Sequence, residues 1–236
     1  MLKDFAQRSY ELERIDTGEY TAREYDEFLR EIRLVNRFAG DTWALKKTLF
    51  TEIERGDLRK FSILDVGAGS GELLRTCAAF ARNTRRAARL TGLELNTRSA
   101  NSILEESRRY PEISSVRADA LNLPFEDDSF DFVICSLFTH HFREREIQSI
   151  LNGMARVARR KIFVIDLHRH PVASLLYKAF CAVLIRGVLV KTDGALSILR
   201  GFKPSEFEAI AHDAGLNSPA VKRRFPFRLV LEAEAK

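Results

Sequence analysis

The sequence predicts an α/β fold in which a mostly parallel sheet of seven strands carries helices on both faces. Short apolar runs alternate with helical patterns from residue 61 onward, and the first run ends in a glycine-rich turn, 65-DVGAGSG-71. This alternation is typical of strand–helix–strand units, which share one crossover hand. The carboxyl ends of the strands and their loops are therefore expected along one edge of the sheet.

The strands are expected in order along the chain. The first five are FSILDVG (61–67), RLTGLEL (89–95), residues 114–118, FDFVICSLF (130–138) and RKIFVIDLH (160–168). Because nearly continuous apolar runs are typical of strands buried on both faces, we expect these five to pair in parallel. Two more strands, at 219–226 and 227–233, are separated by Pro226 and are expected to complete the sheet as an antiparallel pair.

Helical segments flank and interrupt this sheet. We expect a helical cap at 1–58, a ligand-binding core at 59–168, an apolar helical lid at 169–203, and a last helix with two strands at 204–236. Within the lid, 172–190 is expected as one helix, with Lys178 and Arg186 about 80° apart around its axis. Such an apolar helix needs cover from the domain core, a partner chain, a membrane surface or a hydrophobic substrate.

The composition excludes several classes of protein. With 45% hydrophobic and 30% charged residues, the chain is neither disordered nor membrane-spanning, and two cations interrupt the longest apolar stretch. Three cysteines without C-x-x-C spacing predict reduced, buried thiols and no metal site. The charged N-terminal stretch has no apolar signal core, so we expect a cytoplasmic protein; monomer and homodimer stay open.

The glycine-rich turn raises the question of what approaches its backbone: a nucleotide phosphate, a methyl donor, or nothing if the turn is structural. Gly67, Gly69 and Gly71 lead into a helical pattern, where a ligand can lie on the backbone. Neither the dinucleotide spacing nor a phosphate-binding lysine follows. Asp65 and Glu72 would repel a pyrophosphate but suit an ammonium or sulfonium group. Glu94, at the end of the second strand, is placed to bind ribose hydroxyls.

Four segments resemble the class I S-adenosylmethionine-dependent methyltransferases over about residues 60–215. They are 63-ILDVGAGSGEL-73, 92-GLELN-96, 118-ADALNLPFEDDSFDFVICSLFTHHF-142 and 155-ARVARRKIFVIDL-167. The resemblance implies a Rossmann-like fold and S-adenosylmethionine as cofactor. Two further segments, 33-RLVNRFAG-40 and 194-GALSILRGFKPSEF-207, look like small bacterial methyltransferases associated with polyketide-type phenolic lipids.

The resemblance also implies roles at matching positions. Glu94 would hold the ribose and Leu95 would pack on the adenine, while Asp119 and Ala120 would read the adenine amino group. The residues implied at the methionine end are Asp65, Gly67, Ala68, Gly69, Gly71, Ser136 and Leu137, with Arg33 or Arg37 for its carboxylate. A solvated helix face is the alternative for either arginine.

Several titratable side chains follow the fourth and fifth strands. Because a phenol has a pKa of about 10, its methylation near neutral pH gains from a general base. Asp166 and His170 stand in this group, and the side chains that we select as catalytic candidates are His140, His141 and His168.

The resemblance and the apolar lid together favour O-methylation of a phenolic or otherwise hydrophobic small molecule. C-methylation of a quinol-like ring and a non-catalytic donor-binding subunit are the alternatives. Enzymes that methylate exocyclic base or amide nitrogens carry Asn-Pro-Pro or Asp-Pro-Pro after the fourth strand, where this chain has CSLF. The basic stretches 82–89 and 221–225 then read as solvated surface, and nucleic acid is not expected as a partner.

Overall fold

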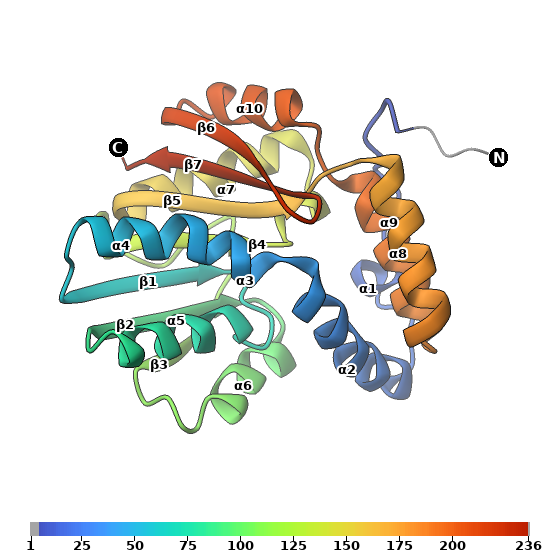
Figure 1. Cartoon of the computed structure of the whole chain (residues 1–236), viewed down its shortest axis with the longest axis horizontal. Helices are drawn as coiled ribbons and strands as arrows, with labels where there is room; N and C mark the ends of the chain where they lie inside the picture. The colour runs from blue at the N-terminus through green and yellow to red at the C-terminus, as the bar shows by residue number, and fades with distance from the viewer. Residues whose placement is uncertain (1–4, 236) are drawn as a thin grey trace.

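A seven-stranded sheet runs through the molecule in the order β3-β2-β1-β4-β5-β7-β6 (Figure 1). The computed structural model describes residues 5–235, apart from the side chains of Ala22, Asp26, Arg33, Arg37, Phe38 and Ala39. All neighbouring strands are parallel except β7, which is antiparallel to both β5 and β6. The predicted sheet is thus confirmed. Its strands are β1 (Lys60–Val66), β2 (Ala87–Glu94), β3 (Ile113–Arg117), β4 (Phe130–Ser136), β5 (Ala158–Leu167), β6 (Asn217–Arg224) and β7 (Arg228–Glu234).

Helices cover both faces of the sheet, which explains the nearly continuous apolar runs. On one face, Val133 and Val164 pack beneath α7 (Glu144–Val157) and α10 (Pro204–Asp213). On the other face, Phe132 and Phe163 pack in a second cluster with α4 (Thr51–Arg55), α5 (Glu72–Asn83) and α6 (Thr97–Glu106). Successive side chains of a strand point to opposite faces, so both sets along β4 and β5 must be apolar.

The remaining helices gather beyond the carboxyl ends of the parallel strands (Figure 1). They are α1 (Arg14–Thr17), α2 (Ala22–Ala39), α8 (Pro171–Leu184) and α9 (Val188–Arg200); α3 (Asp41–Leu45) and the π-helical turn η1 (Lys46–Phe50) instead continue into α4 and pack in the second cluster. Phe28 and Val35 of α2 pack against Cys181, Ile185 and Val190 in a small separate core. In the described residues, no helix combines the length and the apolar character needed to cross a membrane.

The structure corrects one prediction: 172–190 is two helices. Ile185 has extended backbone dihedrals and Gly187 caps the start of α9, so Arg186 lies in the break and not on a common helix with Lys178. The Glu31 carboxylate of α2 accepts hydrogen bonds from the backbone N–H of Arg186 (2.9 Å) and of Gly187 (3.0 and 3.1 Å). A carboxylate that satisfies the backbone donors at a helix start stabilises the break there.

Candidate active site

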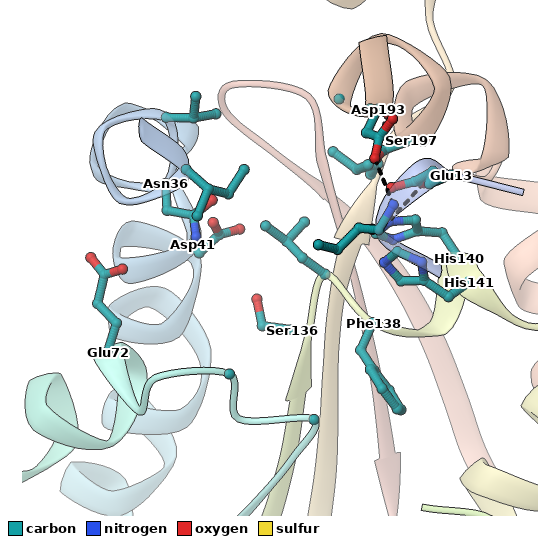
Figure 2. Close-up of a pocket in the computed structure, with 18 of the residues that line it drawn as sticks. Glu13, Asn36, Asp41, Glu72, Ser136, Phe138, His140, His141, Asp193 and Ser197 are labelled. Carbon is teal, nitrogen blue, oxygen red and sulfur yellow. Dashed lines mark hydrogen bonds and ion pairs between the residues drawn. The ribbon is translucent and has the colours of Figure 1, made fainter. Parts of the chain in front are cut away.

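A cavity of about 700 Å³ opens at the carboxyl edge of the sheet. Its floor is formed by the turns after β1, β2, β4 and β5, and α1, α2, α8 and α9 surround it. Figure 2 shows two walls: Glu72, Asn36 and Asp41 on one side, and Glu13, His140 and His141 on the other, with Ser136 between them. The strand order brings these walls together because β1 and β4 are neighbours at the centre of the sheet.

The glycine-rich turn forms one part of this lining. Gly67, Gly69 and Gly71 all have positive φ angles (71°, 55° and 79°), which L side chains rarely adopt. Gly67 and Ala68 donate their backbone N–H groups to the Leu93 carbonyl, which fixes the turn against β2. Gly67, Ala68 and Gly69 line the cavity, whereas a Cβ on Gly71 would lie 3.2 Å from Ile103. Gly71 therefore allows close packing of α6 at the start of α5.

Two acidic side chains lie beside this turn. Glu94 accepts hydrogen bonds from the backbone N–H of Gly69 (3.1 Å) and of Asn96 (3.2 Å), so its carboxylate is held at the cavity wall. Asp65 is buried, and burial together with the neighbouring Glu94 raises its pKa to about 8. A buried carboxyl with a raised pKa has no cation to balance its charge. The pair is suited to a positively charged ligand.

The other residues that the resemblance assigned to the donor fall into three groups. Ser136 and Leu137 line the cavity, and Leu137 donates its backbone N–H to the Ile165 carbonyl. Leu95 is 59% exposed, and Asp119 accepts a hydrogen bond from the backbone N–H of Leu121 (2.9 Å); these two and the buried Ala120 lie outside the cavity lining. The side chains of Arg33 and Arg37 lie outside the described part of the structure.

His140 and Asp166 form a buried pair on the opposite wall. His140 Nδ1 lies 2.7 Å from Asp166 Oδ1, while Thr139 Oγ1 and the backbone N–H of His140 donate to Oδ2. Burial alone would raise the pKa of Asp166, but the charge of His140 and these hydrogen bonds hold it well below its usual range. Because the carboxylate accepts, a neutral imidazole here would carry its proton on Nδ1, and its lone pair on Nε2, which lies 3.9 Å from Glu13 Oε1.

Two arginines donate hydrogen bonds to backbone carbonyls at and next to the two histidines. Arg200 donates to the carbonyls of His140 (3.2 Å) and His141 (2.7 Å), and Arg8 donates to the carbonyls of His140 and Phe142 (both 2.9 Å). Arg200 also pairs with Asp16, which lies 2.9 Å from His141 Nδ1. Burial opposes ionisation of Asp16, yet these two partners lower its pKa to about 2.

Glu13 lies next to His140 on the same wall of the cavity. The sequence analysis did not select Glu13 as a site residue. Its side chain is buried, Oε1 accepts no hydrogen bond, and 3.9 Å separates this atom from His140 Nε2. Burial raises the pKa of Glu13 to about 7. No local pattern marks Glu13 in the sequence, whereas Asp193 and Arg200 are charged residues in a largely apolar helix, a pattern that could have marked them as buried.

All three catalytic candidates line the cavity, but their surroundings differ. His168 is half-buried, and burial together with His170 lowers its pKa. The His170 side chain accepts from the backbone N–H of Val172 and so caps α8. The structure thus brings His140 and His141 to one wall and His168 to another part of the same lining.

Glu13, His140 and His141 also offer three potential metal-ligand atoms that lie within 4.8 Å of one another. Arg200 Nη1 lies 3.5 Å from Glu13 Oε1 and already supplies positive charge to that carboxylate. A second cation there would be repelled. The absence of a metal requirement stays a prediction.

Part of the chain is similar in sequence to known methyltransferases. Residues 63–161 match a family model described as a methyltransferase domain. A phthiotriol/phenolphthiotriol dimycocerosates methyltransferase of Mycobacterium tuberculosis H37Rv is 37% identical over 90 residues, which cover 37% of this chain and 32% of that protein. Its Mycobacterium ulcerans counterpart, methyltransferase 1, is 39% identical over 141 residues, covering 53% and 49%. The aligned segments thus span about a third of the first relative and about half of the second.

Solved structures share this fold. Magnesium protoporphyrin IX methyltransferase from Synechocystis, solved with bound SAH, superposes with a TM-score of 0.62 at 17% identity and covers 91% of this chain and 95% of that one. YcgJ of Bacillus subtilis gives 0.54 at 15% identity, covering 80% and 97%. At these identities the similarity to solved structures shows the fold alone. Residues 63–161 thus form a methyltransferase domain, and the fold is that of the class I S-adenosylmethionine-dependent methyltransferases.

Proposed function

We propose that this chain transfers the methyl group of S-adenosylmethionine to a hydroxyl group of an uncharged, hydrophobic acceptor, with His140 as general base. One observation carries the proposal: a single cavity joins the glycine-rich turn with Asp65 and Glu94 to the His140–Asp166 pair. The first half suits a cationic donor, and the second half suits proton removal from the acceptor.

The donor half has negative charge and no balancing cation among the described side chains of the turn. Glu94 keeps lone pairs free for ribose hydroxyls, since each of its oxygens accepts one backbone hydrogen bond. A donor ammonium or sulfonium would supply the charge that buried Asp65 lacks. Gly67, Ala68, Gly69, Ser136 and Leu137 remain our candidates for its methionine end. Gly71 supports the turn from outside the lining, and Leu95, Asp119 and Ala120 remain candidates for the adenine end.

The acceptor half of the cavity is lined mainly by apolar side chains, together with a few acidic ones. Glu13, Asp16 and Asp193 line it, and Arg200 is already paired with the first two. No described side chain there is a free cation that would hold an acceptor carboxylate or phosphate. The mycobacterial relatives methylate phthiotriol and phenolphthiotriol dimycocerosates, which favours a hydroxyl on a hydrophobic acceptor. The apolar lining includes Tyr20, Phe28, Leu29, Ile32, Val35, Phe138, Phe142, Leu176, Tyr177, Phe180 and Ile198.

The residues around His140 can accept and pass on one proton. S-adenosylmethionine, when bound, would supply a methyl carbon that the acceptor oxygen attacks in line, and its carbon–sulfur bond would break with S-adenosylhomocysteine as the leaving group. His140 Nε2 accepts the proton of that hydroxyl, and Asp166 stabilises the resulting imidazolium through Nδ1. Arg8 and Arg200 fix the position of the ring through its backbone. Glu13 can take the proton onward, because its pKa of about 7 leaves it able to bind one near neutrality.

Calorimetric titration with S-adenosylmethionine and with S-adenosylhomocysteine tests the donor half. We expect micromolar binding that Glu94→Ala abolishes and that the matched exposed control Glu126→Ala retains. Absence of binding to either compound would refute the donor site and leave the glycine-rich turn structural.

Turnover with a long-chain alkylphenol tests the acceptor half. We expect His140→Gln to lower kcat about a hundredfold or more with donor affinity unchanged, as loss of a general base does. His141→Gln and His168→Gln should cost less. If all three variants turned over as fast as the unmodified protein, base catalysis would be refuted. A ring-methylated product would favour C-methylation instead. Binding of donor without any methylated product would favour a non-catalytic subunit.

A further inference from the structure

Helix α8 presents two faces of opposite character. At about 100° per residue, Val172, Leu175, Leu176 and Val183 fall within a stripe about 100° wide. Each of these four side chains is between 44% and 80% exposed. On the other side of the helix, Ala173, Ser174 and Cys181 are buried against the body. The apolar stripe therefore lies on the exposed side of the helix.

Two more exposed apolar side chains lie near this stripe: Leu184, the last residue of α8, and Val188, the first of α9, are 50% and 63% exposed. We call these six residues (Val172, Leu175, Leu176, Val183, Leu184 and Val188) the α8 face. They are six of the thirteen large apolar side chains exposed in the described part of the chain, yet they lie within 17 consecutive residues. Scattered exposed apolar side chains are ordinary, but a contiguous set marks a surface that something covers.

The exposed charges that α8, the break and the start of α9 contribute beside the α8 face are all positive. Lys178, Arg186 and Lys191 are exposed, and residues 171–192 contain no aspartate or glutamate. Two acids of α2 lie at the break between α8 and α9: Glu31 is held there by backbone N–H groups, and Glu27 lies beside Gly187. An apolar stripe flanked by lysine and arginine is typical of a helix that lies in the headgroup region of a membrane.

The position of the α8 face adds a second reason. Helices α8 and α9 form the side of the molecule farthest from the sheet, beyond the strand carboxyl ends (Figure 1). Leu176 belongs to the α8 face and also lines the cavity. The exposed apolar surface is thus continuous with the apolar lining of the candidate active site.

We propose that the α8 face docks on an anionic lipid surface, with α8 lying in the plane of the interface. Charge complementarity favours this occupant over a second copy of the chain. A two-fold interface would place the α8 face against itself and bring Lys178, Arg186 and Lys191 toward the same cations of the other copy. If the proposed function holds, a hydrophobic acceptor would reach the cavity past Leu176; lipid docking itself does not depend on that function.

Vesicle co-sedimentation without donor or acceptor tests the proposal and keeps it separate from methyl transfer. We expect the protein to bind vesicles of equal parts phosphatidylglycerol and phosphatidylcholine, and to bind pure phosphatidylcholine much more weakly. Near an anionic surface each cationic side chain contributes roughly fivefold in affinity, so high salt and Lys178→Glu/Lys191→Glu should each weaken binding strongly. Leu175→Glu/Val183→Glu should weaken it at least tenfold.

Matched controls separate this effect from a general change of surface. Leu104→Glu replaces a 50% exposed leucine on α6, and Arg108→Glu reverses an exposed charge that follows it; both should bind like the unmodified protein. Three results would overturn the proposal: no binding to anionic vesicles, equal binding to neutral ones, or loss of binding in the controls. A dimer in light scattering that Leu175→Glu dissociates would also overturn it, since a second copy would then cover the face.

Discussion

Replacement of Asp65 by asparagine should stabilise the donor-free protein at neutral pH while weakening its binding of donor. The Asp65 carboxyl is buried beside Glu94, and its pKa is raised from the ordinary 3.8 to about 8. At pH 7 it is therefore protonated in the folded protein and ionised in the unfolded chain. Asparagine has similar shape and carries no charge at any pH, so the variant avoids this protonation.

The magnitude follows from the pKa difference. A group whose folded pKa is raised contributes stability that is present below its unfolded pKa and is lost as pH rises toward its folded pKa. Between 3.8 and pH 7 this loss amounts to about 4 kcal/mol, at about 1.4 kcal/mol per pH unit. The new amide must find hydrogen-bond partners, which reduces the expected gain of the variant to about 2–4 kcal/mol.

Urea unfolding at about pH 5, 7 and 8 measures this difference. We expect the advantage of Asp65→Asn to grow from about pH 4 to about pH 8 and then to level off. The control Asp127→Asn changes a 73% exposed carboxylate and should show no such pH dependence. A pH-independent difference, or a variant that is less stable at pH 8, would refute the reasoning, because Asp65 would then be ionised in the donor-free protein.

Donor titration in buffers of different ionisation enthalpy gives an independent reading of the same group. The positive charge of the donor favours ionised Asp65, so the unmodified protein should release a proton near pH 7 when it binds. The Asp65→Asn variant should release none from this position and should bind more weakly. Equal proton release in both proteins would assign the proton to another group.

Three further predictions concern single positions. Glu13→Gln should raise the free energy of unfolding by up to about 3 kcal/mol above pH 7 in urea titrations. Burial raises the pKa of Glu13 from 4.5 to about 7, so the unmodified protein loses stability as the pH rises between these values, and the variant does not. Gly67→Ala should lower the melting temperature in calorimetry: its φ is 71° and its Cβ would lie 2.5 Å from the Phe138 ring. Arg228→Met should cost about 3–5 kcal/mol of stability in urea unfolding, because it leaves the Asp41 carboxylate buried and unpaired.

Much of the fold and of the donor half could be predicted from the sequence because their signals are local. Apolar runs bounded by turns specified the seven strands, and the three glycines marked a backbone with positive φ next to a helix start. Glu94 could be assigned because it ends the strand that pairs beside β1. Each of these inferences needs only neighbouring residues and the single crossover hand.

The acceptor half depended on contacts between distant parts of the chain. Glu13 meets His140 and Asp16 meets Arg200 across more than 120 residues, and no periodicity records such a meeting. The break between α8 and α9 likewise depends on Glu31, a residue of α2 that caps backbone groups more than 150 residues away.

The sequence by itself determined the strands as they follow one another along the chain, the glycine-rich turn and the chemical types of side chain at the carboxyl edge. Only the tertiary structure decided which charges are buried together, which imidazole nitrogen faces the cavity, and which face of α8 stays exposed. The physical reason is that pKa values and hydrogen bonds depend on burial and on partners in space, and these arise only when the whole chain packs.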